Sequence, residues 1–190
     1  MKSRKKRKKI YKKKKFANTT APDLNVIRTR KGPIHFPSLQ NVTVFFDSIS
    51  ARVRNLIEEV PYIQVCVCWI TNNMLLNALK KKDGVSLIIS RGAMANKKKA
   101  FYKTLTPITK ERGAVRVLGA EGRNNSLCHH KFAIGLDKDK KAVFLISGSF
   151  NWSVQGQKNI ENLMLFRDKT FIAAWQSEFN LLWNKSTKYV

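Results

Sequence analysis

Short apolar runs alternate with segments of helical periodicity over most of the chain, and this alternation constrains the fold more than any other feature. Strands are expected at residues 42–47, 62–70, 85–90 and 114–118, and helices at 48–60, 73–80 and 97–110. Alternating strands and helices imply crossover connections between parallel strands. We therefore expect an α/β fold whose mixed, mostly parallel central sheet is flanked by helices on both faces.

The C-terminal third has a different pattern. Two strands are expected within residues 129–153 and a third at 160–168, followed by a helix from Thr170. Apolar side chains recur along that helix at Phe171, Trp175, Phe179 and Leu182. This spacing places them on one face, which we expect to pack into the core rather than to bind a ligand.

Basic residues dominate the composition and predict a polyanionic partner. The net charge is +25, and residues 2–15 hold eleven Lys or Arg, which leaves 26 basic and 12 acidic residues, or +14, elsewhere. Such a dense run repels itself, so residues 1–34 are expected to be a disordered tail and connector preceding one domain at 35–190. Nucleic acid is the first partner expected, and anionic membrane surfaces are the second.

The cysteines and the apolar segments predict a soluble intracellular protein. Cys66, Cys68 and Cys128 form an odd set without framework spacing, so we expect reduced thiols packed in strands. No apolar stretch is long enough to serve as a transmembrane anchor. In a eukaryotic host the tail favours the nucleus, and otherwise we expect the cytoplasm. No cofactor and no metal is expected, because adjacent strand residues such as Cys128 and His129 diverge.

Two polar pairs interrupt the apolar strands of the segment 129–153. His129 and Lys131 lie two residues apart, as do Ser149 and Asn151, so each pair shares one face of its strand. A hairpin centred near residue 140 would set His129 opposite Asn151 and Lys131 opposite Ser149. All four side chains would then converge at the open end of the hairpin, while His130 would face the other side.

This group suits attack on a phosphodiester. A neutral imidazole is a capable nucleophile, while an ammonium, a hydroxyl and a side-chain amide can hold the nonbridging oxygens. None of these roles needs a metal ion.

The same residues resemble the HKD signature of the phospholipase D superfamily. The runs HHKFAI and GSFNWS, with the later NIEN, are most similar to its single-motif nuclease branch, which includes the Zucchini-type endonucleases. The motif spans His129 to about Glu161, and the pattern of strands and helices agrees with the family fold over roughly residues 35–185.

The resemblance implies a mechanism with two histidines. One would attack phosphorus to form a phosphohistidine, and the other would protonate the leaving oxygen and then activate water. Because the chain has a single motif, the resemblance implies a homodimer with two copies of His129 at one shared site. It also implies that Glu161 orients a catalytic imidazole, against the alternative of a simple strand cap.

The motif aspartate is displaced relative to the family pattern. Five residues separate Lys131 from Asp137, and ten more precede Gly148. Gly135 could mark a bulge that returns Asp137 to its place, Asp139 could substitute, or the role could be lost. We assign Asp137 to the site.

Further residues are candidates for substrate binding. Lys97, Lys98 and Lys99, together with Lys80–Lys82, could line a groove towards the site and contact phosphates, or they could be ordinary solvated cations. Trp152 could stack on a base, although packing in the core is an equal alternative.

These observations predict a metal-independent phosphodiesterase, an endonuclease that prefers single strands or lacks strong sequence preference. DNA and RNA are both open as substrates. Two alternatives remain: a lipid phosphodiesterase acting on a lipid such as cardiolipin, and a nucleic-acid-binding protein of the same fold with weak or no catalysis.

Overall fold

The computed structural model describes residues 34–35, 41–91, 98–119 and 128–189 of the chain. The predicted basic tail falls almost wholly outside these ranges. No helix within them combines the length and the apolar content that crossing a bilayer requires. In chain order the elements are β1 (Ile34–His35), β2 (Val42–Phe45), α2 (Ile49–Glu58), β3 (Tyr62–Val67), α3 (Asn73–Lys80), β4 (Gly84–Ser90), α5 (Lys99–Tyr102), η1 (Lys110–Arg112), β5 (Val115–Leu118), β6 (Lys131–Leu136), β7 (Ala142–Gly148), η2 (Gly156–Lys158), β8 (Leu163–Phe166), α6 (Lys169–Lys185) and β9 (Thr187–Lys188).

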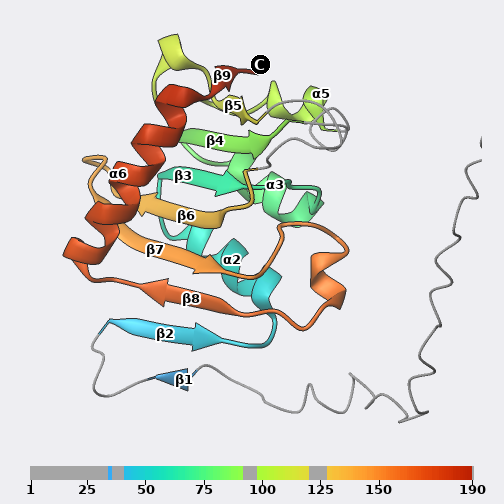
Figure 1. The fold of residues 1–190 in the computed structure, drawn as a ribbon, viewed down its shortest axis with the longest axis vertical. Coiled ribbons are helices and arrows are strands. Elements are labelled where there is room, and N and C mark those ends of the chain that lie inside the picture. Colours follow the sequence, from blue (N-terminus) through green and yellow to red (C-terminus); the bar gives the residue numbers. More distant parts are fainter. Residues whose placement is uncertain (1–33, 36–40, 92–97, 120–127, 190) are drawn as a thin grey trace, which may run out of the picture.

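The strands form one sheet in the order β1-β2-β8-β7-β6-β3-β4-β5-β9 (Figure 1). Only β3–β4 and β4–β5 pair in parallel, while all other neighbouring strands among the described residues are antiparallel. The α/β class is therefore confirmed, but the prediction of a mostly parallel sheet is wrong.

The error has a topological cause. A helical segment between two strands makes them parallel neighbours only when the strands end up adjacent. This holds for β3 and β4, which flank α3, but β2 and β3 flank α2 and are separated by β8, β7 and β6. The hairpin β6–β7 and the strand β8 lie between them, and every pair that these three strands form is antiparallel.

Helices cover both faces of the sheet, as expected. Figure 1 shows α6 crossing one face, with α2 and α3 behind the other. Val53 and Ile57 of α2 and Leu76 of α3 belong to one apolar cluster, whereas Phe179 and Trp183 of α6 belong to a second cluster on the opposite face. The expected stripe on α6 is correct for Phe179, but Phe171 is 42% exposed and lies at its margin.

The prediction of a continuous helix over residues 97–110 is wrong. It is reduced to α5 and the short turn η1, because Pro107 cannot donate a backbone hydrogen bond within a helix. The chain instead runs beside β4, where Val85 N–H donates to the Thr106 carbonyl at 2.7 Å. This segment packs against the sheet without helical structure.

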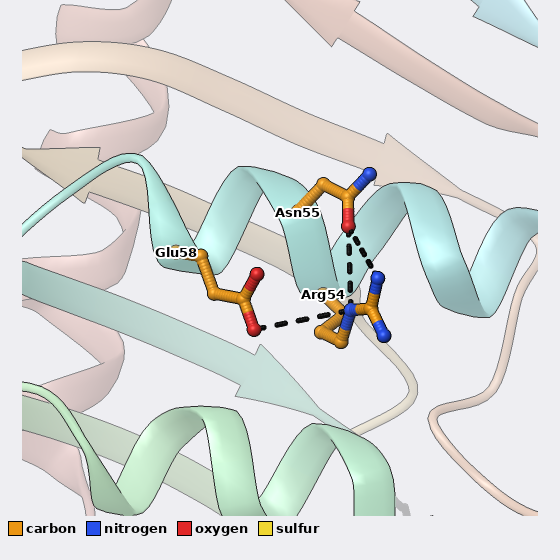
Figure 2. A network of polar contacts seen from close by, with 3 residues as sticks. All are labelled: Arg54, Asn55 and Glu58. Atoms are coloured by element: carbon orange, nitrogen blue, oxygen red, sulfur yellow. Dashed lines mark hydrogen bonds and ion pairs between the residues drawn. The ribbon is translucent and has the colours of Figure 1, made fainter.

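The outer face of α2 contributes little to its position. Arg54 donates from Nε and Nη2 to Asn55 Oδ1 at 3.3 and 2.9 Å, and its Nε lies 3.9 Å from Glu58 Oε1 (Figure 2). These groups are exposed, and such contacts stabilise a helix by about 0.5 kcal/mol at most. Burial of the inner face therefore holds α2 against the sheet.

The hairpin β6–β7 has a register one residue away from the prediction. Phe132 pairs with Ser147, whereas a centre at residue 140 would have set it opposite Gly148. The ladder shifts between Gly135, which pairs with Phe144, and Leu136, which pairs with Ala142. The irregularity expected near Gly135 is present, but the extra residue is Val143 of β7.

Gly135 provides the space for Phe144, and its replacement should destabilise the fold. A Cβ at residue 135 would lie 2.3 Å from Cε1 of Phe144, which is fully buried. We expect Gly135→Ala to lower the free energy of unfolding in urea by about 1–3 kcal/mol. Adding Phe144→Leu should recover part of that loss, and equal stability of Gly135→Ala and the wild type would contradict this packing.

Candidate active site

The candidate residues gather at one edge of the sheet, which we call the site edge. It is the edge where β3, β4 and β7 end and where β6 and β8 begin, at the right in Figure 1. His129 lies two residues before the start of β6, while Ser149 immediately follows β7. Because β6 and β7 are antiparallel neighbours, the start of β6 and the end of β7 lie at the same edge, and so do His129 and Ser149.

His129 and Lys131 form the first group. Lys131 Nζ donates to the His129 carbonyl at 2.9 Å and lies 3.1 Å from the ring nitrogen Nδ1. Lys131 Nζ also lies 3.4 Å from the second ring nitrogen, Nε2. The arrangement therefore places an ammonium directly beside an exposed imidazole.

Trp69 completes the surroundings of His129. Its ring meets the imidazole edge-on, with centroids 6.3 Å apart. Trp69 lies at the site edge just beyond β3, which ends at Val67, and it is not among the site residues predicted from sequence. The signal was weak, since a tryptophan after a strand usually belongs to the core.

Ser149 and Glu161 form the second group. Ser149 Oγ donates to Glu161 Oε2 and accepts from Asn162 N–H at 3.0 Å, and Asn159 Nδ2 donates to Glu161 Oε1 at 3.2 Å. The Glu161 carboxylate is thus held by a serine and an asparagine of its own chain.

Gly148 allows this second group to form. A Cβ at residue 148 would lie 2.3 Å from the carbonyl oxygen of Asn162. The absence of a side chain lets the start of β8 approach the end of β7. In the observed register an extended ladder would set Lys131 opposite Gly148 rather than Ser149, so Lys131 turns to His129 and Ser149 turns to Glu161.

In the sequence Asn151 stands between two aromatic residues, Phe150 and Trp152, whose side chains are buried. Its Oδ1 is buried and has no hydrogen-bond partner in the part of the chain that the structure describes. Its backbone carbonyl accepts from Ser153 N–H at 2.6 Å. The predicted pairing of Asn151 with His129 does not occur, because the hairpin register differs by one residue.

Asp137, which the sequence assigns to the site, lies in the β6–β7 turn. Its Oδ1 accepts from the backbone N–H groups of Asp139 and Lys141, both at 2.9 Å, so the carboxylate closes the β6–β7 turn. Six residues of extended chain, or about 20 Å, separate it from Lys131. Neither Asp137 nor Asp139 lies at the site edge.

His130 lies as predicted, whereas of the three cysteines only Cys66 lies within a strand, and Cys68 and Cys128 lie outside β3 and β6. His130 faces α6, with Nε2 3.9 Å from Glu178 Oε1 and its ring against Phe132. The three cysteines are buried, and Cys66 Sγ lies 3.6 Å from Cys128 Sγ. Hydrogen bonding with Cys128 and burial raise the pKa of the Cys66 thiol, while the bond from Cys66 lowers the pKa of Cys128 to about 7.

The predicted substrate-binding residues divide into two sets. Lys98 lies at the site edge, where its Nζ donates to Asn73 Oδ1 at 2.9 Å, and Lys99 Nζ lies 5.7 Å from the Tyr189 ring centroid. Lys97 falls outside the described residues. Lys80–Lys82 precede β4 and so lie at the opposite edge, where Lys82 Nζ donates to the Val60 carbonyl at 2.8 Å.

Trp152 cannot stack on a base in this conformation. Its side chain is only 1% exposed and belongs to the apolar core. Its carbonyl accepts from Thr71 N–H at 2.9 Å, which ties the segment after β7 to the segment after β3. Of the two roles that the sequence leaves open for Trp152, the structure shows packing in the core.

Comparisons with known proteins agree with this fold. Residues 54–183 match the family described as "Cardiolipin synthase, PLD-like domain". The mitochondrial cardiolipin hydrolase of Canis lupus familiaris is 37% identical over 83 residues, which cover 40% of this chain and 31% of that protein. The matched segments span between 31% and 60% of the curated cardiolipin hydrolases.

Two solved structures share the fold at lower identity. NucT from Helicobacter pylori superposes with a TM-score of 0.60 at 17% identity, over 78% of this chain and 98% of that one. Nuc from Salmonella typhimurium, described as a phospholipase D family member, gives a TM-score of 0.57 at 18% identity, over 78% and 97%.

Proposed function

The chain belongs to the phospholipase D superfamily, and from that membership we propose that it is a metal-independent phosphodiesterase that cleaves nucleic acid internally. The observation that carries the proposal is the pairing at the site edge of an exposed imidazole with an ammonium, 3.1 Å apart. Ser149 and Asn151 follow the neighbouring strand at the same edge. The net charge of +25 favours a polyanionic substrate.

In the proposed reaction His129 attacks phosphorus and the leaving oxygen departs with a proton. Lys131 donates to the nonbridging oxygens, where a single preorganised donor contributes about 3–4 kcal/mol to transition-state stabilisation. Asn151 is proposed to hold the same oxygens through its side-chain N–H groups. Ser149 is proposed to join it when its single hydroxyl proton, which Glu161 accepts in the free protein, turns to the phosphate. Water then releases the phosphate from the phosphohistidine.

The proton donor is proposed to come from a second subunit. An imidazole that has become a phosphohistidine cannot at the same time protonate the leaving oxygen, so a second group must do so. The chain has one HKD motif, and a C2 homodimer would bring a second His129 to the same phosphorus. Orientation of that imidazole by Glu161 remains a prediction.

Lipid phosphodiesterase activity is the second candidate. It is favoured by the similarity to proteins named as mitochondrial cardiolipin hydrolases. The same side chains would attack either diester, since the groups that surround phosphorus are alike in lipid and nucleic acid.

The binding-only alternative loses its main support. The irregular spacing of the motif aspartate had suggested weakened catalysis, but Asp137 closes a turn at the opposite edge of the sheet. Its displacement therefore carries no argument against chemistry at His129.

A substrate panel distinguishes these functions. Purified protein is incubated in EDTA with end-labelled single-stranded and double-stranded DNA, with RNA, and with cardiolipin vesicles. We expect internal cleavage of nucleic acid that EDTA does not inhibit, with single strands preferred. Release of phosphatidic acid from the vesicles alone would assign the lipid function, and binding of nucleic acid without cleavage would assign the binding function.

A further inference from the structure

A pocket of about 410 Å³ adjoins the candidate active site at the site edge. Its wall is built from three separate segments: the start of α2, Met74 of α3, and the segment from Phe150 to Glu161. Asn159 and Glu161 line the pocket and also belong to the group around Ser149. A ligand in this pocket would therefore lie directly beside the proposed reaction centre.

The charge of the pocket differs from that of the whole chain. The chain has 37 Lys or Arg against 12 acidic residues. Among the described residues that line the pocket, however, there are two acids, Asp47 and Glu161, and no Lys or Arg. Arg52 lies 3.7 Å from Asp47 and offsets that carboxylate from outside the lining. A phosphate group would meet carboxylates here, so the lining disfavours an anion.

The lining offers aromatic and apolar surface instead. Phe46, just after β2, lines the pocket and is 42% exposed, while Ile49 and Phe150 line it as buried apolar residues. A partly exposed aromatic side chain in the lining of a pocket is suited to stacking against a planar ring. The volume is within the range of small-ligand sites and exceeds that of a single base.

A buried hydroxyl without a partner in the pocket wall favours a ligand that has a polar edge. Ser50, at the start of α2, is 8% exposed, and its Oγ has no hydrogen-bond partner in the described part of the chain. An unpartnered buried hydroxyl is unfavourable, and a ligand that donates or accepts one hydrogen bond would offset that cost. The amides of Gln157 and Asn159 add further donors and acceptors.

We propose that this pocket binds one unstacked nucleobase of a single-stranded substrate, next to the scissile phosphate. Phe46 stacks on the ring, and Ser50 and Asn159 contact its polar edge. The inference rests on the proposed nuclease function and refines it, because a base can enter the pocket only after leaving a duplex stack.

Removal of single bases tests the proposal. Single-stranded oligonucleotides carrying one abasic residue at successive positions around a fixed cleavage site are compared with the intact strand. For the wild type we expect one position beside the cleaved bond at which base removal lowers kcat/KM about 10-fold. Phe46→Ala should lower kcat/KM on the intact strand by a similar factor, with no further loss on that abasic strand.

Two further variants separate this role from a structural one. Phe171→Ala removes a phenylalanine of equal exposure, 42%, on the opposite face of the sheet, and should cleave intact and abasic strands as the wild type does. Ser50→Ala removes an unpartnered hydroxyl, so it should keep the thermal stability while narrowing the differences in cleavage rate among the four bases at that position.

The outcomes distinguish failure of the base-pocket proposal from failure of the proposed nuclease function. Cleavage that is insensitive to every abasic position, or a Phe46→Ala loss that is equal on intact and abasic strands, would overturn the base pocket and leave the nuclease intact. If no nucleic acid is cleaved, fluorescence anisotropy measures the affinity of the protein for the same intact and abasic strands and still tests the pocket. Tighter binding of the intact strand that depends on Phe46 would support the pocket, and equal binding would overturn it.

Discussion

Replacing His129 with alanine should lower the rate of phosphodiester cleavage by roughly 10⁴-fold or more. The imidazole is proposed to supply the nucleophile and, from the second subunit, the proton donor, so one substitution removes both functions from the dimer. Lys131 and Ser149 would remain, and they cannot replace an attacking nitrogen. The measurement is single-turnover cleavage of an end-labelled oligonucleotide in EDTA.

His130→Ala is the matched control for this substitution. The two histidines are adjacent, but His130 lies against Phe132 and Glu178 on the opposite face of the sheet. We expect this variant to retain cleavage within about threefold, since surface changes away from the site have small effects. Acid quench of the wild-type reaction should also trap labelled phosphate on the protein, and His129→Ala should trap none. Substantial cleavage by His129→Ala would refute the assigned nucleophile.

The local alternation of the strands made much of the site predictable from sequence. Neighbouring residues on a strand face opposite sides, and this rule correctly separated His129 from His130. The same rule with the hairpin connection placed Ser149 at the edge where His129 lies. Such deductions need only the period of a strand and one short turn, and both are local properties of the chain.

Register and tertiary contacts were not predictable in the same way. At the turn Leu136 pairs with Ala142, two residues from the predicted register, and the extra residue Val143 reduces the difference to one. Nothing in the sequence distinguishes a bulge in β7 from one in β6. Asp137 closes the turn because two backbone N–H groups meet its carboxylate, which depends on the turn conformation. The antiparallel sheet followed from strand order, which is a long-range property.

The candidate base pocket could not be predicted from the sequence for the same reason, because it depends on tertiary contacts. Its lining joins Phe46 and Ser50 to Asn159, more than a hundred residues away along the chain. No periodicity relates these positions, so each residue alone is typical of an ordinary surface or helix start. Only packing of α2 beside the segment after β7 gives them a common surface.

Mixing wild-type protein with His129→Ala should inhibit cleavage more than dilution does. If the reaction needs His129 from both subunits, a mixed dimer lacks either the nucleophile or the proton donor at its single site. With free exchange of subunits, activity should follow the square of the wild-type fraction. An equal mixture would then retain about a quarter of the activity per total protein, against about a half for independent sites.

The mixing experiment needs proof that the subunits exchange and a control variant that does not alter activity. Two affinity tags allow mixed dimers to be isolated and assayed directly, and mixtures with His130→Ala should retain the activity of the two parent proteins. His129 is exposed at the site edge, and His130 lies against Phe132 and Glu178, so the second imidazole at the same phosphorus is proposed to come from the partner subunit. A linear dependence on the wild-type fraction, with exchange demonstrated, would therefore mean that one subunit supplies every group the reaction requires, and the search for a proton donor would turn to Glu161 and Lys131.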